Sequence, residues 1–323
     1  MVDGNNAVQP MIAQGGNVLA DGNEALDLLA MGLLVVLCAS WGLSQVTIKL
    51  ANQGVSPIMQ GGIRSAVAAV LVAGWMAVRR ESLLGRDGTL WWGIGAGLLF
   101  SIEFLLIYWG LDLTNASRAV IYLYTAPFVV ALGARFFIPG EDLGKIQVLG
   151  LCCAFSGIVV AFGESINLHS ARMLLGDIML LGAALFWGIT TVMIKATSLA
   201  RISPGKTLLY QLLVSALVLP LGSMAKSEPG IFKMTPLIAG CIVYQAVWVA
   251  FITYLVWFWL IRQYPASRLA SFTFLTPLFG VLAGAVLLDE PITKALLLAL
   301  VLVGAGIYLV NRRWDRRPGS PTP

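Results

Sequence analysis

The chain has 323 residues, of which 58% are hydrophobic and only 11% are charged, and its mean hydropathy is +0.84. Soluble domains carry about 25% charged residues, so this composition excludes a water-soluble globular protein and indicates an all-α integral membrane protein. The net charge of +5 is spread along the chain, so we expect no nucleic-acid partner.

The chain begins with a polar stretch and continues with ten apolar segments. Residues 1–24 contain no Lys or Arg and no continuous apolar block, which predicts a disordered cytoplasmic tail. Each apolar segment can be extended to the roughly 20 residues that a helix needs to cross a bilayer. These segments lie at roughly 26–50, 57–78, 89–111, 115–138, 143–162, 173–196, 204–223, 236–262, 266–288 and 291–311.

Basic residues are distributed unevenly between the breaks. If the N-terminus is cytoplasmic, fourteen Lys and Arg residues fall on the cytoplasmic side and seven on the other. Basic loops tend to remain in the cytoplasm, so we predict a multi-pass protein of the cytoplasmic (inner) membrane with both termini inside. Residues 312–323 then form a basic cytoplasmic tail that contacts anionic membrane lipids.

The second half of the chain repeats the first. The motif Ala-Ser-Arg followed by a Pro occurs at 116–127 and again at 266–277, an offset of 150. Each motif ends in a proline, Pro127 or Pro277, and both prolines predict helix kinks near the middle of the membrane.

The repeat predicts two units of five helices, residues 25–165 and 166–311. Because five is odd, the second unit starts on the opposite side of the membrane from the first. The predicted fold is therefore ten transmembrane helices arranged as a 5+5 inverted-topology repeat. Such repeats place a binding site near the membrane midplane, between the two halves.

Sequence patterns of enzymes are missing. His169 is the one histidine of the chain, which makes two-histidine zinc motifs impossible, and no Walker-type phosphate loop occurs. The four cysteines all lie in apolar segments, where they suit packing. We therefore expect no catalytic residue, no metal site and no cofactor, and a protein that is not an enzyme.

Polar and aromatic residues recur at helical spacing inside the apolar segments. Trp41 and Gln45 lie four residues apart on one helix face, and Trp187 and Thr191 occupy the equivalent positions of the second repeat. Such residues can line a cavity for a small amphiphilic molecule, whereas the alternative for the aromatic ones is packing or an interfacial belt. The candidate cavity residues are Trp41, Gln45, Glu103, Tyr108, Tyr122, Trp187, Thr191, Tyr244, Gln245 and Trp248.

Four ionisable residues need separate interpretations. Glu103 lies near the middle of the third segment, where a carboxyl group can bind a substrate amine, take up a proton, or serve as a structural partner of Arg64. Arg64 can hold a substrate carboxylate, but its position near the segment end favours a side chain that reaches the membrane surface. Lys49 and Lys195 lie late in their helices, where positive charge suits the helix dipole.

The paired blocks "YWGLDLTNASRAVIYLYTAPFVVALGARFFIPGEDLGK" and "FWLIRQYPASRLASFTFLTPLFGVLAGAVLLDEPITK" resemble the drug/metabolite transporter (DMT) superfamily. In its ten-helix amino-acid and metabolite exporters, the fourth and ninth helices carry an Ala-Ser motif, a proline and a following Glu. The matching residues here are Ala116, Ser117, Pro127 and Glu141, then Ala266, Ser267, Pro277 and Glu290.

The resemblance implies a secondary transporter that exports amino acids and related amphiphilic metabolites by alternating access. The many aromatic residues are similar to those of the branch that exports aromatic amino acids. Small-molecule substrates are the expected partners, protons are a candidate coupling ion, and no oligomer is required. The alternatives are a channel or facilitator for small metabolites, and a membrane-embedded enzyme or lipid-handling scaffold.

Overall fold

The computed structural model describes residues 26–82, 87–114, 116–163, 170–288 and 294–312. The predicted tail at 1–24, His169, Glu290 and most of the basic tail lie outside these residues. The described part of the chain is helical and contains no β-strand, only an isolated bridge between Val55 and Ile231.

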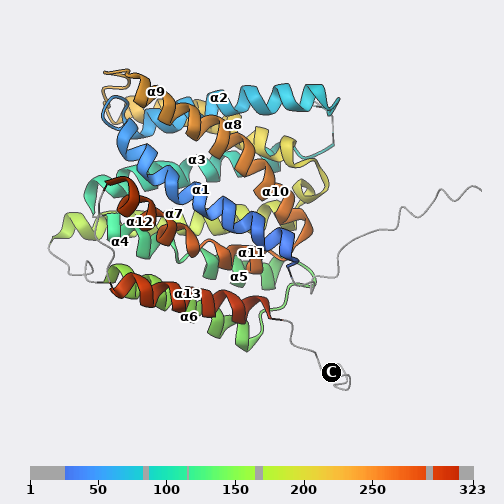
Figure 1. The fold of residues 1–323 in the computed structure, drawn as a ribbon. Helices are drawn as coiled ribbons and strands as arrows, with labels where there is room; N and C mark the ends of the chain where they lie inside the picture. The colour runs from blue at the N-terminus through green and yellow to red at the C-terminus, as the bar shows by residue number, and fades with distance from the viewer. Residues whose placement is uncertain (1–25, 83–86, 115, 164–169, 289–293, 313–323) are drawn as a thin grey trace, which may run out of the picture.

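The helices follow the ten predicted segments closely, as Figure 1 shows. Their bounds are α1 Leu28–Ala51, α2 Pro57–Val78, α3 Leu90–Leu113, α4 Ala116–Leu123, α5 Ala126–Phe137, α6 Lys145–Phe162, α7 Ala171–Ala196, η2 Ser198–Arg201, α8 Pro204–Ala225, α9 Pro236–Val243, η3 Tyr244–Thr253, α10 Tyr254–Gln263, α11 Ala266–Phe272, α12 Leu275–Leu288 and α13 Lys294–Asn311.

Three of the membrane-crossing units are composite. The α4–α5 pair forms one crossing, the α9–η3–α10 series another and the α11–α12 pair a third. Within the described residues, nine spans are long and apolar enough to cross a membrane, and Leu297–Asn311 adds a shorter apolar helix. The prediction of an all-α membrane protein with ten transmembrane helices is confirmed.

The two ends of the bundle are named here after α1, as the Leu28 end and the Ala51 end. Helix α7 runs opposite to α1, because Lys195 near its end contacts the Tyr264 carbonyl and the Tyr264 hydroxyl donates to Asp27, just before α1. Helices α1 and α7 therefore run in opposite directions.

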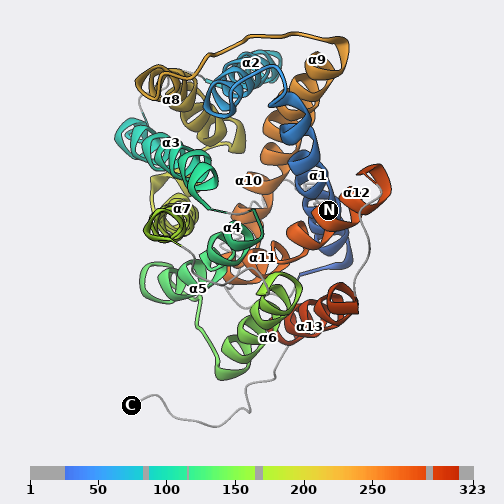
Figure 2. The same cartoon turned by 90° about the vertical axis from the view of Figure 1, so that its left-hand side faces the viewer.

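The helices pack in pairs that correspond between the two halves. Helix α2 packs on α8 and α6 packs on α13, and Figure 2 shows these two pairs on opposite sides of the bundle. Helix α1 packs on α12, and its equivalent α7 packs on α5. A Cβ atom on Gly42 of α1 would lie 2.7 Å from the Gly280 backbone nitrogen, and one on Gly188 of α7 would lie 2.5 Å from Cβ of Val129. Glycine at these positions lets both helix pairs approach closely.

Both proline-containing crossings are broken just before the proline. Two residues separate α4 from α5, and two separate α11 from α12. Pro127 is the second residue of α5, and Pro277 is the third residue of α12. A proline cannot donate to the carbonyl four residues earlier and its ring crowds that carbonyl, so the helix ends before it.

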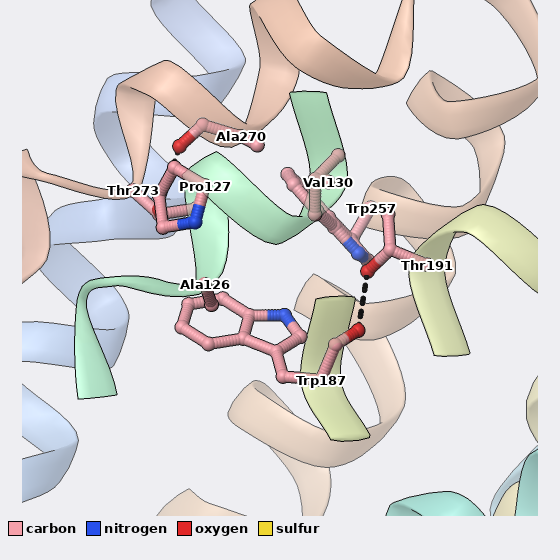
Figure 3. A pocket seen from close by; sticks show the side chains of 8 residues that line it. All are labelled: Ala126, Pro127, Val130, Trp187, Thr191, Trp257, Ala270 and Thr273. Carbon is pink, nitrogen blue, oxygen red and sulfur yellow. Dashed lines mark hydrogen bonds between the residues drawn. The ribbon is translucent and has the colours of Figure 1, made fainter. Parts of the chain in front are cut away.

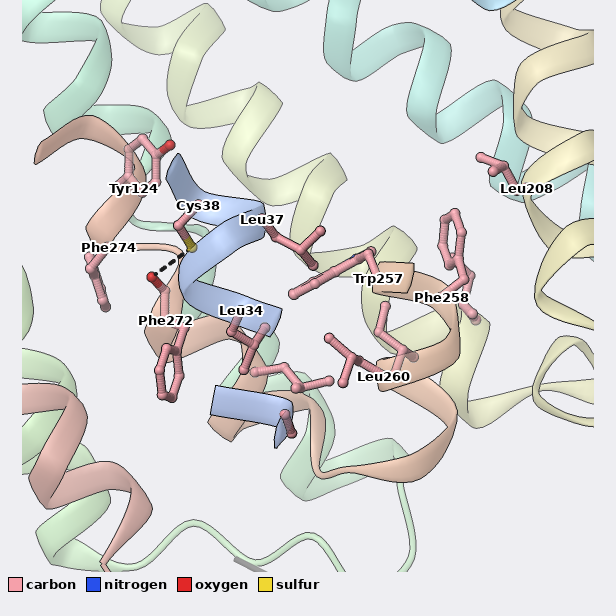
Figure 4. Close-up of a cluster of buried hydrophobic side chains, with 14 of the residues drawn as sticks. Leu34, Leu37, Cys38, Tyr124, Leu208, Trp257, Phe258, Leu260, Phe272 and Phe274 are labelled. Atoms are coloured by element: carbon pink, nitrogen blue, oxygen red, sulfur yellow. Dashed lines mark hydrogen bonds between the residues drawn. The ribbon is translucent and has the colours of Figure 1, made fainter. Parts of the chain in front are cut away.

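A cysteine of α1 satisfies a carbonyl at the second break. Cys38 Sγ donates to the Phe272 carbonyl oxygen at 3.2 Å (Figure 4). The largest apolar core surrounds this contact. It joins α1, α8, α10 and α11 through Leu34, Leu37, Leu208, Phe258, Leu260 and Phe272.

Candidate functional site

A cavity of about 400 Å³ lies between the two halves of the protein. This volume falls in the lower part of the range for small-molecule sites. Its walls include Ile48 of α1, Leu111 of α3 and Ala119 of α4, which lie close to the Ala51 end of their helices. The cavity therefore extends toward the Ala51 end.

The cavity wall is largely aromatic. Trp41 packs edge to face on Trp257 and Tyr254, with ring centroids 5.4 and 6.2 Å apart, and its indole nitrogen donates to Thr253 Oγ1 at 2.8 Å. Its repeat equivalent, Trp187, packs edge to face on another aromatic ring of the wall, that of Tyr124. The aromatic wall residues are Trp41, Phe100, Phe104, Tyr108, Tyr124, Phe162, Trp187, Tyr254, Trp257 and Phe258.

Two residues of this largely aromatic wall are ionisable. Arg64 of α2 and Glu103 of α3 are the one basic and the one acidic residue among the described residues that line the cavity. Their side chains influence each other electrostatically, but no nitrogen of Arg64 lies within 4.0 Å of a Glu103 carboxylate oxygen. The cavity thus contains one basic and one acidic side chain that do not form an ion pair.

Arg64 is held by aromatic rings. Its guanidinium carbon lies 4.5 Å from the centre of the Phe104 ring and 6.0 Å from that of Tyr254, a geometry that favours cation–π attraction. The residue is 3% exposed, and its Nε and Nη2 atoms find no hydrogen-bond acceptor among the described residues. The expectation that Arg64 extends to the membrane surface is wrong, because stacking on Phe104 directs it to the cavity.

Glu103 is 7% exposed and lies ten residues before the end of α3. Phe104 follows it directly, and successive residues of a helix point about 100° apart. The ring that holds Arg64 therefore projects from a different face of α3 than the Glu103 carboxyl group. This explains why the two charges share a cavity without contact.

A narrow crevice continues from the cavity toward the Leu28 end. The cavity and the crevice share Trp187, Thr191 and Trp257. Residues of α5 and α11 also line the crevice, as Figure 3 shows. Within it Thr191 Oγ1 donates to the Trp187 carbonyl oxygen at 3.0 Å. The crevice follows the seam between α7 and the two broken crossings.

An ion pair lies beyond the crevice at the Leu28 end. Lys195 Nζ lies 2.7 Å from Glu141 Oε1, and Lys195 also donates to the Tyr264 carbonyl oxygen. Both carboxylate oxygens of Glu141 accept from the Ala266 backbone N–H, each at 2.9 Å. Glu141 therefore caps the N-terminus of α11 while it neutralises Lys195. We call Glu141, Lys195, Tyr264 and Ala266 the latch.

Six of the predicted cavity residues line this cavity: Trp41, Gln45, Glu103, Tyr108, Trp187 and Thr191. Pro277 also belongs to the wall, whereas Pro127 lines the crevice. Whether any of them binds a substrate stays a prediction.

The structure places the other four predicted residues outside the cavity wall: Tyr122, Tyr244, Gln245 and Trp248. Tyr244 and Trp248 instead pack on α1, where the Tyr244 hydroxyl donates to the Ser40 carbonyl oxygen and Trp248 Nε1 donates to Ser40 Oγ. They lie on η3, a π-helix whose wider turn changes which faces its residues present.

Several wall residues were missed by sequence reasoning. Phe100, Phe104 and Ile107 lie three or four residues from Glu103 or from each other, on the same stripe of α3. The spacing of these residues could have been recognised in the sequence. The latch could not, because Glu141 and Lys195 are far apart in sequence and meet only through the tertiary fold.

The chain is similar to known transporters along nearly its whole length. A probable amino-acid metabolite efflux pump of Escherichia coli (strain K12) is 28% identical over 300 residues, 88% of this chain and 96% of that protein. The uncharacterized transporter YoaV of Bacillus subtilis (strain 168) is 25% identical over 286 residues, 86% of this chain and 94% of that protein. A solved crystal structure shares the fold with a TM-score of 0.75 at 18% identity, covering 86% of this chain and 96% of that one.

Both halves of the chain also match one family separately. Residues 28–163 and residues 174–312 each match the EamA-like transporter family, which agrees with the internal repeat. The ten-helix fold and the cavity between the halves fit a transporter of small molecules. The chain therefore belongs to the EamA-like transporter family of the drug/metabolite transporter superfamily.

Proposed function

We propose that this transporter exports amino acids and related small amphiphilic metabolites across the cytoplasmic membrane by alternating access. The observation that carries the proposal is the cavity between the two halves, which extends toward the Ala51 end, together with the latch, which connects α7, α11 and the α5–α6 turn at the Leu28 end. A small aromatic-lined cavity with two charged groups suits amphiphilic molecules of amino-acid size.

The similarity to the Escherichia coli protein named a probable amino-acid metabolite efflux pump supports the same substrate class. The excess of Lys and Arg in the loops of one side supports an orientation in which the Leu28 end and both termini are cytoplasmic. In that orientation the Ala51 end, toward which the cavity extends, faces away from the cytoplasm.

The two five-helix units act in this proposal as inverted repeats that rock against each other. The breaks before Pro127 and Pro277 let the halves of two crossings move separately, and opening of the latch gives access from the cytoplasm. Protons are a candidate coupling ion, because Glu103 lies at membrane depth in contact with the cavity.

Flux measurements on the purified full-length protein in liposomes test the proposal. Liposomes loaded with unlabelled phenylalanine should take up labelled phenylalanine faster than liposomes without internal substrate, because a carrier exchanges substrates across the membrane. The same assay with and without a pH gradient tests proton coupling. Flux that does not respond to internal substrate would indicate a channel, and no saturable flux for any of a broad amino-acid panel would reject the proposal.

A further inference from the structure

We infer that Arg64 and Glu103 together select zwitterions, so that the site takes an α-amino acid with an apolar, aromatic side chain in preference to its amine or its carboxylate alone. The inference rests on the proposed function and assigns the two binding groups: Arg64 receives the carboxylate and Glu103 the ammonium. It is carried by the observation that a basic and an acidic side chain line one cavity without forming an ion pair.

The cavity wall balances one basic group against one acidic group. With Arg64 and Glu103 ionised, the described wall carries one positive and one negative charge. A buried charge without a partner is costly in a low-dielectric site. A zwitterion supplies a partner to both groups at once, whereas an amine leaves Arg64 without an anion and a carboxylate leaves Glu103 without a cation.

The Arg64 side chain is fixed in position, but its hydrogen-bond donors are not all satisfied. It is almost fully buried, it is fixed by Phe104, and two of its nitrogen atoms have no acceptor among the described residues. A guanidinium held in one orientation loses little entropy when it binds a carboxylate, and its planar set of donors matches the two oxygens. A carboxylate that reaches the guanidinium group would provide the acceptors that Nε and Nη2 lack.

Arg64 and Glu103 lie at different depths in the helix bundle. Arg64 lies seven residues from the start of α2 and Glu103 ten residues from the end of α3, so along the helix axes they are about 10 and 15 Å from the Ala51 end. A ligand bound by both would have its ammonium deeper than its carboxylate. Its side chain would then reach the rings of Trp41, Tyr254 and Trp257.

The internal repeat provides fold-compatible substitutions. Gln211 occupies in α8 the place that Arg64 has in α2, and it is also buried against the cavity. Arg64→Gln therefore introduces the residue type that the second half already carries at the equivalent position. Glu103→Gln preserves the shape of the side chain and removes only its charge.

The inference is tested by measuring the binding of three probes to the detergent-purified full-length protein. Quenching of the intrinsic tryptophan fluorescence of the protein reports the binding. The probes are L-phenylalanine, L-phenylalaninamide, which lacks the carboxylate, and 3-phenylpropionate, which lacks the ammonium. Wild-type protein should bind phenylalanine about tenfold or more tightly than either analogue, since each analogue leaves one charged group unpaired.

The two variants should change this preference in opposite ways. Arg64→Gln should weaken the binding of phenylalanine and phenylpropionate about tenfold or more and leave that of the amide within about twofold. Glu103→Gln should weaken phenylalanine and the amide by a similar factor and leave phenylpropionate within about twofold. Lys49→Gln, which removes an exposed cation outside the cavity wall, serves as the matched control and should change none of the three.

The inference is overturned if wild-type protein binds the three probes equally or does not bind phenylalanine. It is also overturned if folded Arg64→Gln protein loses amide binding as strongly as phenylalanine binding. If either variant fails to give a single peak in gel filtration, the wild-type comparison alone decides. Binding without flux in liposomes would reject the proposed transport and leave the zwitterion site intact, so the two failures can be distinguished.

Discussion

Glu141 and Lys195 form an ion pair of 2.7 Å at the Leu28 end of the bundle, beyond the crevice that leads from the cavity. The Glu141 side chain is 2% exposed and that of Lys195 17% exposed. Because Glu141 also accepts the first backbone N–H of α11, one carboxylate connects the α5–α6 turn, the end of α7 and the start of a broken crossing.

Removal of either partner of this pair should destabilise the protein. Lys195→Met leaves the buried Glu141 carboxylate without its cation, and we expect a loss of about 3 kcal/mol in the free energy of unfolding. Glu141→Gln leaves Lys195 unpaired but keeps an acceptor for Ala266, so its cost should be smaller. The double variant should recover part of the loss, and thermal unfolding in detergent measures all three; additive effects would contradict a coupled pair.

The latch should also control access from the Leu28 end. In a background in which Cys38, Cys152, Cys153 and Cys241 are replaced, a cysteine at Ala270 reports on the crevice, because Ala270 is 4% exposed and lines it. Lys195→Met should raise the rate of maleimide labelling of Ala270→Cys about tenfold, since about 1.4 kcal/mol of the lost pairing energy suffices for that shift in population.

A matched position controls for general loosening of the protein. Cysteine in place of Ala68 on α2, which is fully buried and outside the crevice, should stay unreactive in both backgrounds. Equal labelling of Ala270→Cys with and without Lys195 would show that the latch does not close this end.

The crossing helices could be predicted from sequence because lipid imposes their length. The predicted third segment, 89–111, corresponds to α3 at Leu90–Leu113, since about 20 apolar residues in a row have no other stable environment. The breaks near Pro127 and Pro277 were also predictable, because they follow from the covalent structure of proline.

The internal repeat helped to predict the direction of a side chain. Trp41 and Trp187 occupy equivalent positions and both line the cavity, whereas Trp248 lies on the π-helix η3 and packs on α1. Arg64 shows the same limit, since helical spacing cannot distinguish a cation that faces lipid from one that stacks on Phe104. Contacts between helices decide these cases, and they are not local properties of the sequence.

Gly42 should be intolerant of even one additional carbon. A Cβ atom there would lie 2.7 Å from the Gly280 backbone nitrogen and 2.8 Å from the Thr276 carbonyl oxygen, and backbone atoms cannot move aside easily. We expect Gly42→Ala to lower the free energy of unfolding by about 1–3 kcal/mol. Gly32→Ala, on the same helix with open space around it, should leave stability unchanged or raise it by up to about 1 kcal/mol.

The same thermal unfolding assay compares the two glycine variants. Equal melting temperatures would contradict the close approach of α1 and α12. Because Gly280 is itself part of the cavity wall, Gly42→Ala should also reduce flux, whereas Gly32→Ala should not.

Replacement of a proline at a helix break should reduce transport more than replacement of a proline inside a continuous helix. Pro127→Ala and Pro277→Ala each restore a backbone donor, which favours a continuous helix across the break and stiffens the crossing. We expect a several-fold decrease in exchange flux at nearly unchanged stability. Pro220→Ala, within the uninterrupted α8, is the matched control and should retain flux; equal effects at all three positions would contradict a role for the breaks.

The pairing of Asp87 with Lys206 should stabilise the protein in a pH-dependent way. Lys206 Nζ lies 2.6 Å from Asp87 Oδ2, and Thr89 donates to Oδ1 through both its backbone nitrogen and its hydroxyl group. These contacts, the one with Lys206 first, lower the pKa of Asp87 from 3.8 to about 2. Asp87 lies in the turn between α2 and α3, so it anchors this turn to the start of α8.

A carboxyl group whose pKa is lowered by folding stabilises the protein at pH values above its unfolded pKa and loses that contribution as the pH falls toward the folded pKa. For Asp87 the contribution is complete above about pH 4 and disappears between pH 4 and pH 2. Because its side chain is 36% exposed, solvent screening limits the contribution to about 1 kcal/mol. Asp87→Asn should therefore lower the melting temperature equally at pH 7 and pH 5, and the difference from wild type should shrink at pH 3. A difference that stays constant down to pH 3 would show that the Asp87 carboxylate is not the stabilising group.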